Sequence, residues 1–392
     1  MTTSITPQLV DRVRAAIRSD RLVGTATELI GIPSPTRNAG RVADRLAEIL
    51  RAEGFPVDRP EAGWADAPAV AARFRAAERG RMLQFNGHLD TVHLPFVPPR
   101  VENGMLYGSG ASDMKGGIAA ALEALRVLRE TGLLTRGEIL FTAHDLHESP
   151  WGDGSQVDCL IDAGYIGDGV LIPEYLSDRL ATAGRGLGVL EITVKRDGEP
   201  VHEVLGGIDG PNVIRVGSEI VRRFADLDRE LAKECHPLAG RESLFVGRVS
   251  SGEIYNQSPV TFSLSGTRRW LPRRSVADVE RAVRSELDKT VAGSGTTVDC
   301  QFHLVRDAFE VDAESPLATA FQSVSTAVMG APLPIGAKPF VDDGNTFSAR
   351  GKVTAITHGP AGKGAHTLHE EVPIAELERT ALVYALTAIA FC

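Results

Sequence analysis

The segments MLQFN (82–86), GIAAALEALRVLRE (117–130) and EILFTA (138–143) decide the fold class of this chain. The first and third are short apolar runs typical of buried strands. The second places apolar residues on one face of a helix, and Gly132 follows its end. With a further apolar run at 169–172, the alternation of strand and helix predicts an α/β domain with a mixed, mainly parallel sheet. On such sheets, ligands bind at the carboxyl ends of the strands.

Farther along the chain, the pattern changes to alternation of apolar and polar residues. LGVLEITVK (187–195) and VTFSLS (260–265) both alternate, which is typical of antiparallel strands with one solvated face. A helical pattern follows each of them, at 211–224 and at 275–291. Two strand–helix halves of this kind predict a separate α+β domain.

The length of 392 residues exceeds one average domain of roughly 150 residues, so we expect more than one domain. Apolar helix and strand patterns resume after residue 304, and Pro373 opens a last helix, where Pro is tolerated. The simplest organisation is therefore an insertion. Residues 1–186 and 305–392 form one domain, which the α+β domain at 187–304 interrupts.

The composition argues against several classes of protein. Asp and Glu outnumber Lys and Arg by 51 to 42 and no basic stripe occurs, which argues against nucleic-acid binding. No long apolar run suggests a membrane span, and the N-terminal segment lacks a signal-peptide pattern. The four cysteines are far apart and form no CxxC pair, which fits a reducing cytoplasm. Any metal ion would need histidine and carboxylate ligands.

Two polar motifs follow the first predicted strand. NGHLDTV (86–92) places His88 two residues before Asp90. A metal-bound His commonly gives its second N–H to a carboxylate, so Asp90 could orient His88; a turn with a surface His is the alternative. GSGASDMKGG (108–117) delivers Asp113 directly before a helix, where a carboxylate can also act only as a cap. The spacing of a phosphate-binding loop is absent.

Three further motifs supply the remaining candidates. HDLHE (144–148) directly follows a predicted strand, IPEY (172–175) follows the next one, and GKGAHTLHE (362–370) lies far downstream. Together, the motifs bring five potential ligands to strand ends or glycine-rich loops: His88, Asp113, Glu148, Glu174 and His366. Two imidazoles and three carboxylates suit one or two divalent ions such as Zn, Mn or Co, and a shared Asp can bridge two ions.

The order and spacing of these motifs resemble a family of co-catalytic metallopeptidases. It includes aminoacylase, glutamate carboxypeptidase, acetylornithine deacetylase and succinyl-diaminopimelate desuccinylase, and the resemblance covers essentially the whole chain. It implies that Asp113 bridges two metal ions. His88 and Glu174 would hold one ion, and the other would be held by Glu148 and His366.

The resemblance also implies that the inserted domain is a ferredoxin-like lid and dimerisation domain. The protein would then be a homodimer or a higher homo-oligomer. His202, in GEPVH (198–202), matches a lid histidine that stabilises the oxyanion in a neighbouring subunit's site. Asn256 and Arg269 match positions that bind a substrate carboxylate, to which the Arg fork is suited. Surface solvation of His202 and Arg269 is the alternative.

One position departs from the family pattern. The family has two adjacent Glu residues, the first of which is the general base, whereas this chain has His147 before Glu148. His147 could be the base, since an imidazole titrates near neutral pH, or it could add a metal ligand. Asp145 could be the base if the alignment slips. Trp151, just downstream, is expected in the core rather than as a wall of the substrate site.

We therefore expect a metal-dependent hydrolase that cleaves a C–N bond in a small carboxylate-bearing substrate with metal-activated water, as amidohydrolases and deacylases do. His202 would help to hold the oxyanion, and His147 would shuttle the proton. One alternative on the same scaffold is hydrolytic deamination of an aromatic amino acid such as 5-nitroanthranilate, with release of ammonia by nucleophilic aromatic substitution. Another is an inactive relative that serves as a small-molecule binding module.

Overall fold

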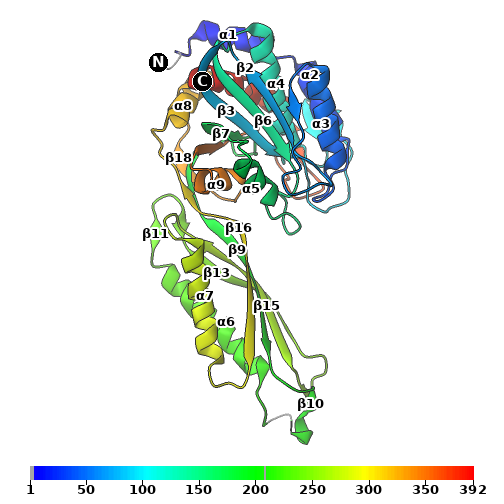
Figure 1. Ribbon diagram of the computed structural model, residues 1–392, viewed down its shortest axis with the longest axis vertical. Coiled ribbons are helices and arrows are strands. Elements are labelled where there is room, and N and C mark those ends of the chain that lie inside the picture. The colour runs from blue at the N-terminus through cyan, green and yellow to red at the C-terminus, as the bar shows by residue number, and fades with distance from the viewer. Residues whose placement is uncertain (1–3, 207–208) are drawn as a thin grey trace. The chain divides into compact units, whose positions relative to one another are not determined.

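The computed structural model describes residues 4–206 and 209–392, which form two compact units (Figure 1). Unit 1 comprises the chain up to Thr182 together with Val311–Ala337 and Asp342–Cys392. Unit 2 comprises Ala183–Glu310 and Lys338–Val341. The insertion expected at 187–304 lies inside Ala183–Glu310 of unit 2. The roles assigned to the two parts, metal binding and lid or dimerisation, stay predictions.

Unit 1 is built around a six-stranded sheet in the order β1-β2-β6-β3-β7-β19. Its strands are β1 (Val57–Asp58), β2 (Val70–Arg75), β6 (Arg136–His144), β3 (Glu78–His88), β7 (Gly169–Ile172) and β19 (Thr354–Thr357). From β6 to β19 the neighbouring strands are parallel, whereas β1 and β2 run antiparallel at one edge. The prediction of a mixed, mainly parallel sheet is confirmed. The apolar runs at 82–86 and 138–143 lie in its two central strands.

Helices pack against this sheet and against one another to form the main core of unit 1. They are α1 (Pro7–Ala16), α2 (Ser19–Ile30), α3 (Gly40–Ala52), α4 (Lys115–Thr131), α5 (Ser155–Asp162), α8 (Pro316–Met329), α9 (Asp343–Ala349) and α10 (Ile374–Phe391). The predicted helix at 117–130 is the body of α4, which is buried from Lys115 to Leu128 and ends at Gly132 in the left-handed region. A small sheet joins β20 (Glu371–Pro373), β5 (Met105–Tyr107) and β4 (Arg100–Glu102).

The register of the parallel strands brings the polar motifs to one edge of the sheet. His88 ends β3 and lies opposite His144, the last residue of β6. Glu174 follows the end of β7 by two residues, and β19 ends beside β7 with Thr357 opposite Ile172. Because carboxyl ends of parallel strands meet at one edge, side chains distant in sequence converge there.

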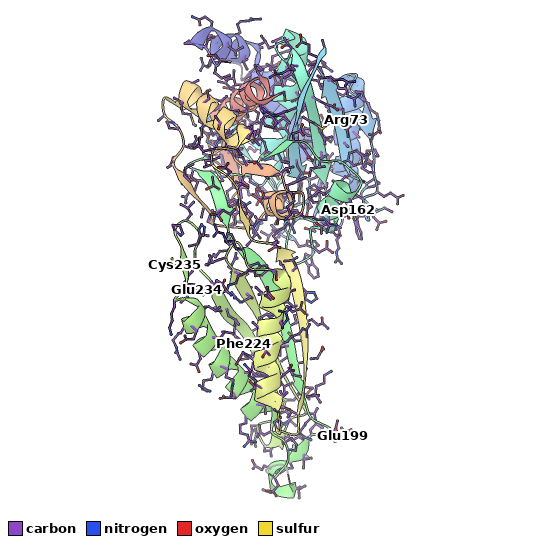
Figure 2. The ribbon with its side chains drawn as sticks, turned by 60° about the vertical axis from the view of Figure 1, so that its left-hand side comes forward. Arg73, Asp162, Glu199, Phe224, Glu234 and Cys235 are labelled. Atoms are coloured by element: carbon purple, nitrogen blue, oxygen red, sulfur yellow. The ribbon has the colours of Figure 1, made fainter. Side chains whose placement is uncertain are left out.

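Unit 2 holds a four-stranded antiparallel sheet in the order β13-β15-β9-β16. Its strands are β13 (Ser243–Ser251), β15 (Thr261–Trp270), β9 (Gly186–Lys195) and β16 (Thr297–Arg306). Two helices, α6 (Val213–Leu231) and α7 (Val276–Val291), share a buried cluster with the sheet, and Phe224 on α6, labelled in Figure 2, belongs to it. The chain order β-α-β-β-α-β is the ferredoxin-like arrangement that was expected.

Neither β13 nor β16 is among the predicted strands, although the sequence of β16 alternates apolar and polar residues from Val298 to Leu304. Most of β13 is exposed, and its pairing with β15 shifts between Val246 and Arg248, so no clean alternation is visible in the sequence. The remaining strands form short ribbons: β10 (Val201–His202) with β14 (Gln257–Ser258), β11 (Cys235–His236) with β12 (Gly240–Arg241), and β17 (Phe309–Glu310) with β8 (Leu180–Gly184) and β18 (Ile335–Lys338). Among the described residues, no helix has the length and apolar character needed to cross a membrane.

Candidate metal centre

His88 points into the polar edge of the unit 1 sheet. Its imidazole is fully buried, with Nε2 3.1 Å from Asp113 Oδ1 and 3.4 Å from Glu174 Oε1. Its Nδ1 lies 2.9 Å from the main-chain carbonyl of Asp90. A carbonyl only accepts, so Nδ1 is the donor there and Nε2 is directed at the carboxylates. The alternative of a surface turn is wrong, because burial rules it out.

Asp90 contacts the loop that carries His147 and Glu148 as well as the His88 ring. Its Oδ2 accepts hydrogen bonds from the backbone amides of His147 at 3.0 Å and Glu148 at 2.9 Å. Its Oδ1 is 3.5 Å from His88 Nδ1, so the shorter contact to the ring comes from the main-chain carbonyl rather than from the carboxylate. Burial opposes ionisation of Asp90, but the hydrogen bond and charge of His88 outweigh it and lower the pKa to about 2.

Asp113 ends the glycine-rich loop before α4 and lies between two histidines. Its Oδ1 faces His88, and its Oδ2 is 3.3 Å from Nε2 of His366. The helix α4 begins with no side-chain cap bond, so the alternative that Asp113 only caps a helix is wrong. The carboxylate instead joins segments that are far apart in the sequence.

Glu370 is a site residue that the sequence analysis does not single out. Its carboxylate accepts hydrogen bonds from the backbone amides of Gly110, Ser112 and Asp113, at 3.1 to 3.2 Å. It therefore ties the loop that carries Asp113 to the downstream loop that carries His366. The only sequence signal for Glu370 is its position at the end of the motif 362–370, in which His366 alone is predicted to have a role.

Glu148 and His366 form the other side of the cluster. His366 Nε2 is 3.1 Å from Glu148 Oε2, and hydrogen bonds to Asp113 and Glu148 raise the pKa of His366 to about 10. Glu148 is buried, whereas the His366 side chain is 55% exposed. The His366 backbone has a φ of 62°, a left-handed conformation that is uncommon for a residue other than glycine. Such strained positions cluster at functional sites.

Glu174 brings a buried carboxylate with an unsatisfied oxygen. The segment approaches α4 so closely that a Cβ at Gly117 would lie 2.0 Å from the Pro173 carbonyl oxygen. Within the described part of the chain, Glu174 Oε2 is buried and has no hydrogen-bond partner. Burial, followed by the charge of Asp113, raises the pKa of Glu174 well above its usual range.

A bound cation would satisfy these groups. Buried charges are normally paired or coordinate metals, and three carboxylates at one point repel each other without a cation. Donor atoms of His88, Asp113 and Glu148 lie within 4.8 Å of one another, as do donor atoms of His88, His147 and Glu174. Mixed histidine and carboxylate donors suit a divalent transition metal. The residues present therefore fit the predicted metal.

His147 lies inside this cluster together with Asp343, which the sequence analysis does not predict. The His147 ring stacks on His88 with a centroid distance of 3.9 Å and an interplanar angle of 6°. Its Nδ1 is 3.0 Å from Asp343 Oδ1. Asp343 begins α9, nearly two hundred residues downstream; an Asp-Asp-Gly sequence at 342–344 is its only local signal, and it indicates a helix start.

Two secondary expectations for this loop are wrong. The Asp145 carboxylate accepts hydrogen bonds from the backbone amides of Arg37, Ala39 and Leu146, at 2.6 to 3.0 Å, so it anchors the loop and is not placed as a base. Trp151 is 47% exposed rather than in the core, and its ring lies 5.3 Å from that of His93. The segment that follows Glu148 lies at the surface, so the Trp151 indole does not pack into the apolar core.

The three residues predicted in the inserted domain all lie in unit 2, whereas the candidate ligands lie in unit 1. His202 Nε2 is 2.9 Å from Asn256 Nδ2, where the ribbon of β10 and β14 ends. The Arg269 side chain is half-buried, and no described residue forms an ion pair with it. Burial and the neighbouring charge of Arg185 lower the pKa of Arg269.

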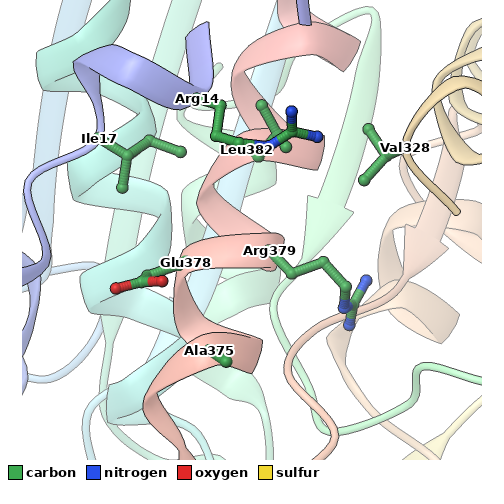
Figure 3. A pocket seen from close by; sticks show the side chains of 7 residues that line it. All are labelled: Arg14, Ile17, Val328, Ala375, Glu378, Arg379 and Leu382. Atoms are coloured by element: carbon green, nitrogen blue, oxygen red, sulfur yellow. The ribbon is translucent and has the colours of Figure 1, made fainter. Parts of the chain in front are cut away.

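One groove of unit 1 contains none of the candidate ligands. It has a volume of about 350 Å³ and lies along α1, α8 and α10 (Figure 3). Its lining consists of Arg14, Ile17, Val328, Ala375, Glu378, Arg379 and Leu382. None of these residues is a candidate ligand, so the size of a groove alone does not locate the candidate chemistry.

Comparison with known proteins gives consistent matches. A model of peptidase family M20/M25/M40 matches residues 84–390. Succinyl-diaminopimelate desuccinylase of Methylobacterium radiotolerans is 28% identical over 399 residues, which cover 93% of this chain and 95% of the relative. The enzyme of the same name from Alkalilimnicola ehrlichii is 25% identical over 390 residues, covering 92% and 96%.

Solved structures share the fold at lower identity. Aminopeptidase PepT from Bacillus cereus superposes with a TM-score of 0.80 at 17% identity, covering 96% of this chain and all of that chain. Human carnosine dipeptidase 1 gives a TM-score of 0.74 at 16% identity, with 98% and 99% covered. The YXEP protein of Bacillus subtilis, described as a dinuclear metal-binding peptidase, gives 0.68 at 15% identity, with 95% and 97% covered.

Proposed function

This chain belongs to peptidase family M20/M25/M40, whose members are metal-dependent hydrolases of amide bonds, and we propose that it hydrolyses the amide C–N bond of a small substrate that bears a carboxylate. The observation that carries the proposal is the convergence of two imidazoles and three carboxylates at one edge of the unit 1 sheet. Among the described residues, a buried oxygen of Glu174 has no hydrogen-bond partner. An N-acyl amino acid or a dipeptide is the substrate class that fits the desuccinylase relatives.

The proposed ligand set follows the contacts. His88 and Glu174 would hold one ion, and Glu148 and His366 a second ion. Asp113 would serve both, since each of its oxygens faces a different histidine. When bound, a divalent transition metal polarises a carbonyl oxygen and lowers the pKa of water, which is the chemistry needed for amide hydrolysis.

Residues around the ligands would keep them in place. The Asp90 carbonyl fixes the His88 ring, and the Asp90 carboxylate fixes the loop that carries Glu148. Glu370 fixes the loop that carries Asp113. Such outer contacts set ring orientation and ligand basicity at metal sites.

We propose that unit 2 supplies substrate contacts. The half-buried Arg269 feels the positive charge of Arg185, and a planar guanidinium group is suited to binding a carboxylate. Arg269 would bind the substrate carboxylate. Asn256 lies beside His202, towards the opposite end of β15, so it would contact the substrate of a neighbouring subunit. His202, which Asn256 holds, would stabilise the oxyanion in a neighbouring subunit, which requires a homo-oligomer.

Product identification tests the proposal. The protein is stripped with a chelator, reloaded with Zn²⁺, Mn²⁺ or Co²⁺, and incubated with one pool of N-acyl amino acids and dipeptides and with another of aminobenzoates. We expect a free amino acid from the first pool, only after metal is restored.

Other outcomes would contradict it. Ammonia and a hydroxylated ring from the second pool would favour aromatic deamination, which no comparison supports. Binding of a small carboxylate without turnover in any metal would favour the inactive binding module. Zn, Mn and Co stay alternatives until metal content is measured in protein purified without added metal.

A further inference from the structure

We propose that His147 is an additional ligand of the metal that His88 and Glu174 hold, and that Asp343 is the residue that positions it. The inference rests on the proposed function and extends it at the one position where the chain departs from the family's paired glutamates. It selects between the two roles that the sequence leaves open for His147, base and ligand.

The hydrogen bond to Asp343 determines which nitrogen of His147 is available. Asp343 Oδ1 lies 3.0 Å from His147 Nδ1, and an ionised carboxylate only accepts. Nδ1 is therefore the protonated nitrogen, and the lone pair of the neutral ring is on Nε2. Metal-bound histidines almost always donate their other N–H to a carboxylate or a carbonyl, and His147 has that partner.

The available nitrogen points at the other donors. His147 Nε2 is 3.7 Å from Glu174 Oε1, the same oxygen that lies 3.4 Å from His88 Nε2. Donor atoms of the three residues lie within 4.8 Å of one another, and the two imidazole rings are stacked. Two histidines and one glutamate are a common donor set of catalytic zinc.

Asp343 is itself held rigidly, which makes it a positioning residue. Its Oδ2 is 2.8 Å from Nε2 of His144 and 3.3 Å from Nδ2 of Asn86, and the residue is fully buried. The other ring nitrogen of His144 lies 2.8 Å from the Asp145 carbonyl. Asp342 caps the helix that Asp343 begins. With both oxygens occupied, Asp343 has little freedom to move, and the His147 ring is oriented through it.

The same geometry disfavours His147 as the general base. The side chain is only 10% exposed, one face is covered by His88, and Nε2 is directed at a carboxylate that already serves His88. A base needs Nε2 within hydrogen-bond reach of the attacking water, apart from the ligand donors. A nitrogen aimed at the donor atoms themselves suits coordination.

Metal binding to the full chain tests the inference independently of turnover. The metal-free protein is titrated with Co²⁺; the dissociation constants and the visible spectrum are recorded, and solvent-exchangeable, paramagnetically shifted imidazole N–H protons are observed by NMR. For His147→Ala we expect one of the Co²⁺ ions to bind at least about 100-fold more weakly, with a changed spectrum and one N–H resonance fewer. Added imidazole should restore part of the affinity.

Asp343→Asn provides the second variant, because it keeps the shape of the side chain and removes its charge. We expect about 10- to 100-fold weaker Co²⁺ binding and a shift of one imidazole N–H resonance, the one that His147→Ala removes. Controls are His93→Ala, a nearby histidine outside both donor groups, and Asp162→Asn, an exposed carboxylate of the same unit (Figure 2). Both should bind Co²⁺ like the wild type.

The failures are distinguishable. If the wild type binds no Co²⁺, the proposed function fails as well. If His147→Ala, folded as judged by its thermal transition, binds Co²⁺ with wild-type affinity and spectrum and loses only turnover, His147 is a base and the inference is overturned. Equal weakening by His93→Ala would show a general loss of structure, which would also overturn the assignment.

Discussion

The two units place their candidate functional residues in opposite ways. In unit 1, Asp113, Glu148 and Glu174 are buried, and each is fixed by contacts that span many residues of sequence. In unit 2, His202 and Arg269 are partly exposed, and His202 stands on a ribbon of two-residue strands. Metal ligands must be held within a fraction of an ångström, whereas groups that meet a substrate can adjust on binding. If the proposed roles hold, the difference separates rigidly held metal ligands in unit 1 from adaptable substrate contacts in unit 2.

The largest effect should follow from removing the shared carboxylate. Asp113→Ala should lower metal content and reduce turnover by well over the ~100-fold typical of losing an outer contact, because both ions lose a ligand. Metal analysis after dialysis and the rate of amino-acid release check this. Asp162→Ala, which removes an exposed aspartate of the same unit, should change neither. Normal metal content in Asp113→Ala would remove it from the ligand set.

His202→Ala should distinguish the function of unit 2 from that of unit 1, because it should lower kcat and leave metal binding intact. Loss of one oxyanion donor typically lowers kcat by about 10² to 10³. Steady-state kinetics with metal-loaded protein checks this, and His303→Ala, an exposed histidine of the same unit, is the matched control. An unchanged kcat would mean that His202 is only solvated, as the sequence alternative allows.

Arg269→Ala should act on KM rather than on kcat. Hydrogen bonds to charged groups contribute about 1.5–3 kcal/mol, so KM for a carboxylate substrate should rise about 10- to 100-fold. The comparison with the corresponding amide substrate, whose KM should change little, identifies the group that is bound. Arg248→Ala, an arginine of the neighbouring strand β13, is the control. A KM that stays constant would place Arg269 outside the pocket.

Acid stability should depend on unit 1. Burial and the charge of Arg379 lower the pKa of His358 to about 3, below the unfolded value near 6.5. Stability is therefore fully present above about pH 6.5 and declines as the pH falls towards 3, by up to about 1.4 kcal/mol per pH unit. The three histidines of unit 2 are not buried.

His358→Gln should flatten that decline, at some cost in stability near neutral pH. Chemical denaturation of the whole chain between pH 4 and 7 measures it. His303→Gln, at an exposed position, should leave the pH dependence unchanged. An equally steep decline in His358→Gln would assign the acid sensitivity to other groups.

The sequence predicted what depends on local pattern. Apolar runs and helical spacing located β3, β6, β7 and α4, and the motifs beside these elements contain four of the five candidate ligands. The fifth, His366, lies in the downstream motif 362–370. Local patterns also explain what the sequence does not predict. An exposed strand with a bulge, such as β13, has no regular alternation of apolar and polar residues. Trp151 was assigned to the core because an aromatic residue alone carries no information on the burial of its loop.

The sequence by itself determined the family, the mixed α/β class and the kinds of donor atoms, because residue types and their spacing along one segment carry that information. Only the tertiary structure decided which donors meet and what holds them. Asp343 reaches His147 from a helix nearly two hundred residues away, and Glu370 reaches Asp113 over an even longer separation. No local pattern encodes such contacts, since they exist only once parallel strands have brought distant loops to the same edge of the sheet.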